Sequence, residues 1–324
     1  YLCSLEKSSI HALVHKCYCF YNLKQKLLND RMESRNMAIG IILLVQSVLG
    51  ILGNIFLLLY YLILYYKECT LKIVDLILTH VFTSNFLIIL SKGPAQIMAA
   101  FGWNQFFNDV GCKHILYIQR LGRSMSISTT CLLSVFQAIT ISPRNSYWKE
   151  IKIKTTKLIG LLILLCWIVC LLVNTFFPLN ASTKRNSKNK TQKRGFEFCL
   201  SQGRDKVVDT VYIAFWVFPE VLFSVLIVCS STFMIVTLYG HKKRVQGILS
   251  THASQRMSPE NRATQKILTL VGTFLAFYTL SSILQGYIAL SHNPSWWVMN
   301  ITSIISMCFP TLGPFVMSHY SIFS

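Results

Sequence analysis

Charged side chains are scarce in this chain. Aspartate, glutamate, lysine and arginine together make up 13% of its 324 residues, whereas a soluble domain carries about 25%. Hydrophobic residues make up 53%. The length would allow two soluble domains, but this composition argues against a large soluble protein and favours one built from apolar helices.

Acidic residues are especially few, with 12 acidic side chains against 31 basic ones and a net charge of +19 at pH 7. Such an excess suits nucleic-acid binding when basic and aromatic residues alternate along a stripe. Here the basic residues lie between apolar segments, so we expect no nucleic-acid partner. An anionic membrane surface and a cytoplasmic protein partner account for the charge better.

Catalytic and metal-binding constellations are also lacking. The sequence offers no convergent set of nucleophile, base and metal ligands. Cys17 and Cys19 form a single C-x-C pair without a second pair, which is too little for a metal site. We therefore predict that the chain is not an enzyme and holds no cofactor or metal.

Long apolar segments, in contrast, dominate the chain. A bilayer core of about 30 Å requires about 20 apolar residues in a helix, and seven segments reach this length: 38–66, 73–91, 113–141, 158–178, 211–238, 267–290 and 296–317. They predict an all-α fold, a seven-transmembrane helix bundle of the plasma membrane. No internal repeat and no pair of broken helices is visible, so the common signature of secondary transporters is missing.

The two ends of the chain lie outside this bundle, which covers residues 38–317. Residues 1–37 form an amino-terminal extension without the order of basic, apolar and small residues that marks a signal peptide. Met32 or Met37 suits the start of the protein, in which case residues 1–31 are a non-native or disordered extension. Residues 318–324 form a short cytoplasmic tail, for which truncation is one interpretation.

The orientation of the bundle rests on the loop between the fourth and fifth segments. Basic residues divide almost evenly between the two faces when Lys92 is counted in the loop after the second segment, so the positive-inside rule decides nothing. Asn180 and Asn189 begin N-x-S/T glycosylation sequons in the fourth-to-fifth loop, and Asn189 is the better acceptor. Glycosylation there would place this loop and the amino terminus outside.

Two cysteines then lie on the oxidising side, where a disulfide persists. Cys112 stands at the start of the third segment and Cys199 in the fourth-to-fifth loop. A disulfide between them would tie this loop to the third segment. Their spatial proximity does not follow from the sequence.

Arg120 and Arg123 lie inside the third segment. Each costs roughly 2.5–3.5 kcal/mol on insertion scales, which makes both candidates for function. At about 1.5 Å per residue they lie roughly 12 and 16 Å below Cys112. We predict that they line a ligand cavity open to the outside and contact an anionic or strongly polar ligand. The alternative is that they bond carbonyls, waters or an acid and serve only the fold.

Other segments supply further candidates for this cavity. Glu220 is the only carboxylate deep in an apolar run, and it either pairs with an arginine or stays protonated through desolvation. Its position nearer the cytoplasm than Arg120 leaves a direct pair open. Tyr278 acts as a movable aromatic beneath the ligand or simply packs in the core, and Phe277 and Gln285 lie on or near the pocket face of the same helix.

Several landmarks are similar to those of rhodopsin-like G-protein-coupled receptors. Gly53, Asn54, Trp167 and Pro219 stand where that class places the same residues. Others are altered: Asn85 replaces an aspartate, Phe136-Gln137-Ala138 replaces Asp-Arg-Tyr, Tyr278 and Leu280 replace Trp and Pro, and Gly313-Pro314-Phe315-Val316-Met317 replaces Asn-Pro-x-x-Tyr. We expect Asn54 and Asn85 to hydrogen-bond between helices, each bond contributing on the order of 1 kcal/mol.

This set of departures resembles the vomeronasal type-1 receptors. The strings that carry the resemblance span Met37 to Met317 and are Leu90–Pro94, Met98–Gly102, Asn108–Cys112, Ser124–Asn145, Ser258–Thr264, Phe277–Ser282, Asn293–Trp297 and Phe309–Pro314. The resemblance implies a chemosensory receptor for small pheromone-like molecules. It also implies coupling to an inhibitory-class heterotrimeric G protein.

The cytoplasmic ends of the helices carry the expected G-protein contacts Gln137, Arg144, Lys243 and Arg244. Basic side chains there also suit anionic lipid. Since Phe136-Gln137-Ala138 lacks an acid and an arginine, the resting state must be restrained elsewhere or more loosely.

Two alternatives stay open. A channel or transporter would require a polar path through the inner half of the bundle, but below Arg123 the third segment offers only Ser, Thr and Gln137. A degraded, non-signalling receptor is the second alternative, because the chain opens without Met and its tail is short.

Overall fold

The structure is a computed structural model of the chain. It describes the backbone of residues 2–68, 72–101, 109–142, 146–175, 181–183, 193–195, 199–202, 206–248, 259–291 and 295–322. Within these ranges, the side chains of 2–33, 68, 99, 109, 146–149, 181–216, 241–267, 289–290 and 318–322 lie outside the description.

The described residues form seven helices and three short strands. The helices are α1 (Leu2–Glu68), α2 (Ile73–Ala100), α3 (Asp109–Ile141), α4 (Ser146–Thr175), α5 (Lys206–Ile248), α6 (Pro259–Leu290) and α7 (Trp296–Ile322). Each contains a stretch long and apolar enough to cross a membrane. The predicted seven-transmembrane bundle is therefore confirmed.

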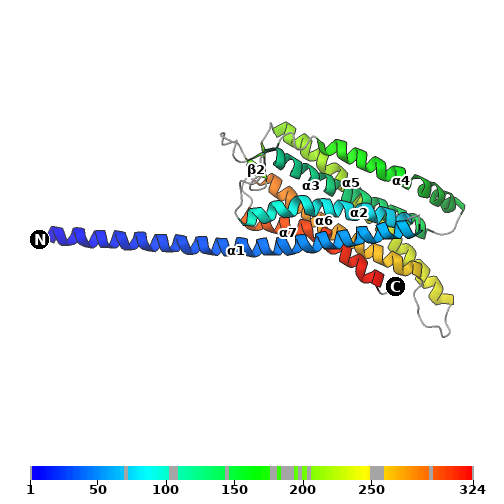
Figure 1. Ribbon diagram of the computed structural model, residues 1–324, viewed down its shortest axis with the longest axis horizontal. Coiled ribbons are helices and arrows are strands. Elements are labelled where there is room, and N and C mark those ends of the chain that lie inside the picture. The colour runs from blue at the N-terminus through cyan, green and yellow to red at the C-terminus, as the bar shows by residue number, and fades with distance from the viewer. Residues whose placement is uncertain are drawn as a thin grey trace.

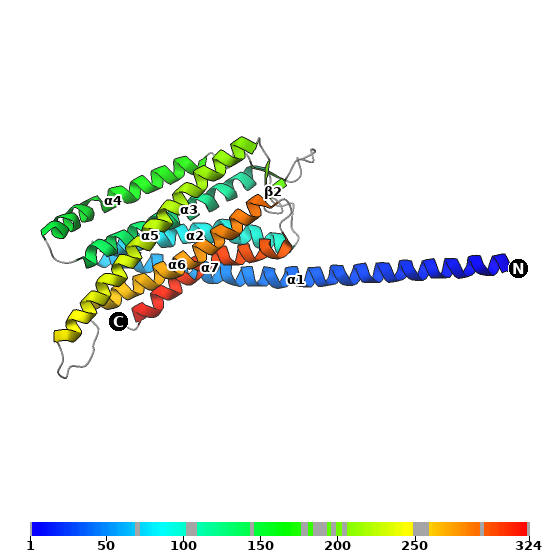
Figure 2. The same cartoon turned by 180° about the vertical axis from the view of Figure 1, so that it is seen from behind.

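Helix α3 lies at the centre of the bundle. It packs against α2, α4, α5 and α6, while α1 packs against α2 and α7. Figure 1 shows α1 continuing far beyond the bundle at its amino-terminal end, so that the predicted extension 1–37 is helical from Leu2 and continuous with the first span. Figure 2, from behind, shows α5 crossing in front of α3 with α6 and α7 beside it.

A small sheet follows α4. Strand β3 (Cys199–Gln202) lies between β1 (Ala181–Thr183) and β2 (Lys193–Gly195), and both pairings are antiparallel. Strands β1 and β3 contact α3. We call this end of the bundle, from which α1 projects, the sheet end (Figure 1). The sequence analysis did not predict these strands.

Helix α2 is longer than predicted. The second segment was expected to end at residue 91, but the helix continues through Pro94 to Ala100. Lys92 is consequently not a loop residue: it lies inside the helix with only 3% of its surface exposed. The loop assignment of Lys92 was wrong because a lysine followed by Gly-Pro resembles a helix end, although apolar residues resume directly after Pro94.

Polar side chains join the helices, as predicted for Asn54 and Asn85. Asn54 is fully buried, and its amide donates to the Pro310 carbonyl on α7 at 2.9 Å. Pro314 has no N–H to donate to that carbonyl four residues earlier, so Asn54 satisfies a group that the helix cannot. Asn85 accepts a hydrogen bond from Ser126 on α3 at 3.3 Å. Both predicted interhelical hydrogen bonds are present.

Candidate functional site

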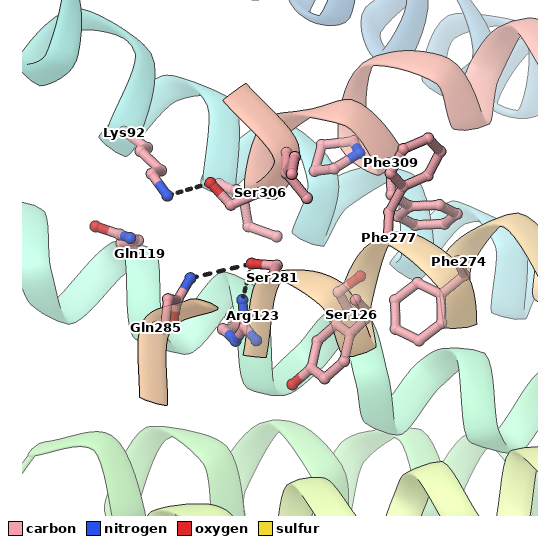
Figure 3. A pocket seen from close by; sticks show the side chains of 14 residues that line it. Lys92, Gln119, Arg123, Ser126, Phe274, Phe277, Ser281, Gln285, Ser306 and Phe309 are labelled. Carbon is pink, nitrogen blue, oxygen red and sulfur yellow. Dashed lines mark hydrogen bonds between the residues drawn. The ribbon is translucent and has the colours of Figure 1, made fainter. Parts of the chain in front are cut away.

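A cavity of about 30 Å³ lies between α2, α3, α6 and α7. Figure 3 shows the side chains that line it: Ile88, Lys92, Gln119, Arg123, Ser126, Phe274, Phe277, Tyr278, Ser281, Gln285, Ile305, Ser306, Phe309 and Pro310. A space of this volume holds roughly two water molecules. In this conformation the cavity admits a small polar group, and a larger molecule requires the helices to separate.

The lining is divided into two levels by the directions of the helices. Polar side chains from the sheet-end parts of all four helices form one level: Lys92, Gln119, Ser281, Gln285 and Ser306. Aromatic side chains lie deeper and form the floor: Phe274, Phe277, Tyr278 and Phe309. From Gln119 to Ser126 on α3 the cavity extends about 10 Å along the helix. A molecule with one polar group and an apolar body would suit both levels.

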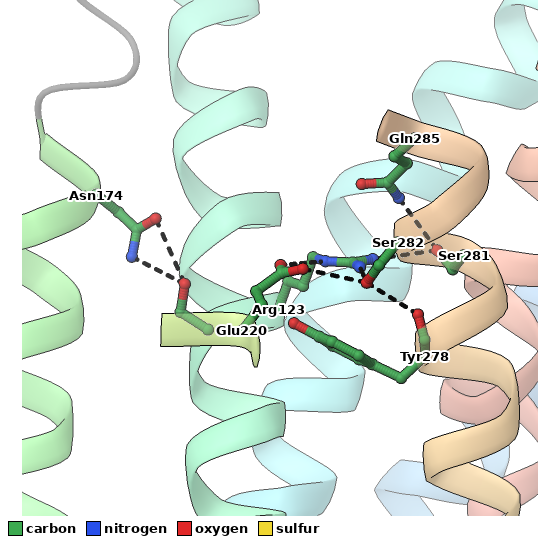
Figure 4. A network of polar contacts seen from close by, with 8 residues as sticks. Arg123, Asn174, Glu220, Tyr278, Ser281, Ser282 and Gln285 are labelled. Atoms are coloured by element: carbon green, nitrogen blue, oxygen red, sulfur yellow. Dashed lines mark hydrogen bonds and ion pairs between the residues drawn. The ribbon is translucent and has the colours of Figure 1, made fainter. Parts of the chain in front are cut away.

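Arg123 is the hub of a polar network that joins three helices (Figure 4). Its Nε donates to Glu220 on α5 at 3.0 Å. Its Nη1 donates to Ser281 and its Nη2 to Ser282 on α6, at 3.1 and 2.6 Å. Ser282 in turn donates to the second carboxylate oxygen of Glu220 at 3.1 Å. One guanidinium thus ties α3 to α5 and α6.

The Arg123–Glu220 pair is largely buried, with 12% and 14% of the two side chains exposed. The guanidinium also lies 4.3 Å from the ring centroid of Tyr278, an attraction of up to about 2 kcal/mol where water is excluded. Removing one partner of such a pair leaves a buried charge and costs about 3–5 kcal/mol. The open question about Glu220 is thereby answered: it pairs with Arg123.

Lys92 supplies a second cation to the cavity. Its ammonium donates a hydrogen bond to Ser306 on α7, as Figure 3 shows. One helical turn further toward the sheet end, Gln96 donates to Ser303 at 2.8 Å. These bonds form a polar seam between α2 and α7. The sequence analysis missed Lys92 because it ended the helix at residue 91, directly before Lys92, whereas α2 continues to Ala100.

Two contacts, one with α2 and one with α4, fix the position of α3. A Cβ on Gly122 would lie 2.9 Å from Ile88 Cγ1 and 3.1 Å from the Ser84 carbonyl oxygen, so only glycine allows α2 so near. On the opposite side of α3, Ser124 hydrogen-bonds to Asn174 of α4. Arg123, between these two contacts, is held toward α5 and α6.

The structure brings four of the five predicted ligand residues to this cavity: Arg123, Tyr278, Phe277 and Gln285. Arg120 is half-buried on α3 and does not line it. Residues three apart on a helix differ by about 60° in direction, which is enough to separate the two arginines. No part of the structure tests ligand binding, so all five assignments stay predictions.

The predicted G-protein contacts whose backbone the structure describes lie toward the opposite end of the bundle. Gln137 is buried, with 6% of its surface exposed. Arg144 lies outside the described residues. Lys243 and Arg244 lie on the last turns of α5, and their side chains are outside the description. These assignments also stay predictions.

At the sheet end, Cys112 is buried and disulfide-bonded. The other cysteines whose side chains are described are free: Cys131, Cys166, Cys170, Cys229 and Cys308. The predicted partner Cys199 begins β3, but its side chain is outside the description, and the sequon residues Asn180 and Asn189 lie outside the described residues. The pairing and the glycosylation stay predictions.

Metal binding has no support in the described part of the chain, where no three His, Cys, Asp or Glu side chains gather closely enough to hold an ion. The chemistry available at the cavity is charge and hydrogen bonding.

Comparison with known proteins shows which family the chain resembles. The sequence profile of the vomeronasal organ pheromone receptor family matches residues 37–322. Human vomeronasal type-1 receptor 4 is 46% identical over 88% of this chain and 95% of its own length. Human vomeronasal type-1 receptor 2 is 45% identical over 85% of this chain and 69% of its own length.

A more distant relative, rat vomeronasal type-1 receptor 90, is 29% identical over 84% of this chain and 87% of its own length. The similarity therefore covers all seven helices and the cavity between them. Together with the seven membrane-spanning helices, it identifies a multi-pass plasma-membrane protein. The chain belongs to the vomeronasal type-1 pheromone receptor family.

Proposed function

We propose that the chain is a chemosensory G-protein-coupled receptor and not an enzyme. It binds a small pheromone-like molecule in the cavity and activates a heterotrimeric G protein of the inhibitory class. The observation that carries this proposal is the double role of Arg123. This residue lines the cavity and simultaneously binds Glu220 of α5 and Ser281 and Ser282 of α6.

A receptor of this kind works by population shift. The ligand must bind the active bundle more tightly than the resting one. A ligand that contacts Arg123 or Tyr278 changes the attraction that holds α5 and α6 against α3. Because these helices cross the whole bundle, a change in their packing at the cavity also alters the opposite end.

The network also supplies the resting-state restraint that Phe136-Gln137-Ala138 cannot form. In our proposal the acid–arginine lock lies beside the ligand cavity, in the sheet-end half of α3. Ligand binding and release of the lock then occur in one place.

The sheet end faces outward in this proposal, with the amino terminus outside. Glycosylation of Asn189, and less readily of Asn180, and a disulfide between Cys112 and Cys199 belong to this side. The start of β3 at Cys199 and the contact of β3 with α3 support the pairing. Gln137, Arg144, Lys243 and Arg244 then face the G protein.

The test is a nucleotide-exchange assay on membranes from cells that express the full chain, with surface protein quantified by labelling. A panel of sulfated steroids and small volatile molecules supplies the ligands. We expect at least one to accelerate exchange on an inhibitory-class G protein, and Arg123→Gln to abolish the response at equal surface level. A ligand-gated ion current without nucleotide exchange would indicate a channel instead. Surface protein without either response would contradict the proposal.

A further inference from the structure

The cavity wall contains an amide that the protein itself leaves unpaired. Gln119 on α3 makes no hydrogen bond to another described residue, and its side chain faces the cavity (Figure 3). It lies one helical turn from Arg123 toward the sheet end, on the same face of α3. A carboxamide has two donors on its nitrogen and an acceptor oxygen. Since an unpaired polar group in an enclosed space is unfavourable, a ligand gains free energy by pairing with it.

The charged groups of the same wall are already engaged within the protein. Arg123 is paired with the Glu220 carboxylate at 3.0 Å. Lys92 donates to Ser306 on α7 and has a further interaction as well. The hydrogen-bonding capacity that remains for the head group of a ligand is therefore concentrated in amides.

Gln285 on α6 supplies a second amide at the same level of the cavity. Its Nε2 donates to the Ser281 hydroxyl at 3.1 Å, and this hydroxyl also accepts a hydrogen bond from Arg123. The Oε1 atom of Gln285 makes no hydrogen bond within the described part of the chain, which leaves it as an acceptor for a ligand. Ser281 thereby connects the amides at the cavity to the Arg123 network.

We propose that Gln119 determines the ligand specificity of the cavity, and that the ligand is an uncharged molecule whose head group both donates and accepts hydrogen bonds. A hydroxyl or a primary carboxamide meets this requirement. The Gln119 Nε2 donates to the head group, the head group donates to Oε1 of Gln285, and the apolar body lies against Phe277, which lines the cavity. A carboxylate or a ketone accepts hydrogen bonds but cannot donate one, so it satisfies only the Gln119 side of this arrangement.

The volume of the cavity agrees with this division of the ligand into two parts. About 30 Å³ accommodates a small head group but not an apolar body. Binding of the body therefore requires α6 to move away from α3 at the level of Phe277. The same movement draws Ser281 and Ser282 away from Arg123, to which both are hydrogen-bonded. Recognition of the head group is in this way coupled to the polar network.

This inference rests on the proposed function, but its test does not require signalling. The full chain is purified in a non-ionic detergent, and its thermal unfolding midpoint is measured against the concentration of three probes with the same benzyl body. Phenylacetamide donates and accepts hydrogen bonds, phenylacetone is uncharged and only accepts them, and phenylacetate is an anion that only accepts them. A molecule that binds the folded state raises the midpoint, and a tighter binder raises it more. Ionic strength is held constant with sodium chloride.

Three variants with the same chemical change make the test specific. Gln119→Met and Gln285→Met each replace a cavity amide with an apolar side chain of similar length. Gln96→Met is the matched control, because Gln96 donates to Ser303 on α7 but does not line the cavity. Comparison of the variants at equal probe concentration also cancels any effect of the probes on the detergent.

We expect the wild type to bind phenylacetamide about tenfold more tightly than phenylacetone or phenylacetate, because of the additional hydrogen bond. Gln119→Met should lower the affinity for phenylacetamide and phenylacetone alike by about tenfold, since both accept from Gln119. Gln285→Met should lower the affinity for phenylacetamide alone, since only this probe donates. Gln96→Met should bind all three probes as the wild type does.

Stability without a probe distinguishes a binding role of Gln119 from a structural one. Gln119 has no hydrogen-bond partner among the described residues, so Gln119→Met should unfold at the wild-type temperature or above it. Gln96→Met loses its bond to Ser303 and should unfold at a lower temperature. A loss of stability in Gln119→Met as large as that in Gln96→Met would overturn the inference, because it would show that the amide serves the fold.

The probe measurements can overturn the inference in three further ways. These are phenylacetate binding as tightly as phenylacetamide, an unchanged affinity for phenylacetamide in Gln119→Met, and no stabilisation of the wild type by phenylacetamide at millimolar concentration.

The outcome also separates this inference from the proposed function. Phenylacetamide binding that depends on Gln119, without G-protein activation by any ligand, would support the site and contradict the function. G-protein activation that is unaffected by Gln119→Met would support the function and overturn the role of Gln119.

Discussion

The two halves of α3 use polar side chains in opposite ways. In the sheet-end half, Arg123, Ser124 and Ser126 bond to side chains of four other helices. In the other half, hydroxyl groups bond mainly to carbonyls of α3 itself: Ser128 to Ser124, Thr129 to Met125, Thr130 to Ser126 and Thr140 to Phe136. Hydrogen bonds between helices fix the relative positions of neighbouring helices, whereas hydroxyl groups that bond to the backbone of their own helix do not.

This contrast indicates which part of the bundle restrains the positions of the helices. The cavity lies beside the half with cross-helix bonds, so a ligand there meets the groups that hold the helices together. The other half contacts its neighbours largely through apolar packing, for example Leu133 with the core around Phe82 and Phe274. Apolar packing tolerates small displacements better than buried ionic bonds do. The second half of α3 and its neighbours can therefore shift when the packing of the sheet-end half changes.

The largest effect should come from removing one member of the buried ion pair. Glu220→Met leaves the Arg123 charge buried, and we expect it to lower the free energy of unfolding by about 3–5 kcal/mol. The double variant Arg123→Met with Glu220→Met removes both charges and should recover most of this loss. Thermal unfolding of the purified variants measures both, and a double-mutant cycle gives the coupling energy. Additive effects of the two single variants would show that the pair is not coupled.

A smaller effect is expected where α2 approaches the sheet-end half of α3. Gly122→Ala places a Cβ 2.9 Å from Ile88, and we expect overpacking to cost about 1–3 kcal/mol. The control is Gly160→Ala on α4, where nothing lies within 4 Å of the added Cβ. That variant should be neutral or slightly stabilising, since alanine has the higher helix propensity. Equal unfolding midpoints for the two variants would argue against the close approach.

The smallest effect compares one hydroxyl from each half. Ser126→Ala removes the bond to Asn85 on α2 and should cost about 0.6–1 kcal/mol, as interhelical bonds in membranes do. Thr130→Val removes a bond to α3's own backbone and should change the unfolding free energy by less than about 0.5 kcal/mol. Chemical denaturation of both variants provides the measurement. A larger loss for Thr130→Val would invalidate the distinction between the halves.

Much of the fold followed from the sequence, because segment length and composition suffice to define membrane helices. The positions of all seven spans were predicted. The fourth was expected to begin at residue 158, whereas its apolar stretch begins at Glu150. The end of α2 was also predicted wrongly, since the helix continues through Pro94, and with it the cavity residue Lys92 was missed. The sheet after α4 was also missed, because a polar loop with short strands has no clear alternation of apolar residues.

The site was harder to predict than the fold. The sequence analysis predicted that Arg120 and Arg123 both line the cavity, but of the two only Arg123 does. The pair between Arg123 and Glu220 stayed open because the relative height of two helices depends on their tilt and crossing. Pro219, directly before Glu220, lies inside α5 and adds to that dependence. The tilt and crossing of two helices do not follow from the residue pattern of either segment alone.

The central claim is that the network around Arg123 restrains the resting receptor. Ligand-free nucleotide exchange on the G protein tests it most directly, in membranes with equal surface levels of wild type, Ser282→Ala, Glu220→Gln and the control Thr130→Val. Ser282→Ala weakens the network without leaving an unpaired charge. The account predicts that ligand-free exchange rises severalfold in Ser282→Ala and Glu220→Gln and stays at the wild-type rate in Thr130→Val. Wild-type rates in all four would contradict it.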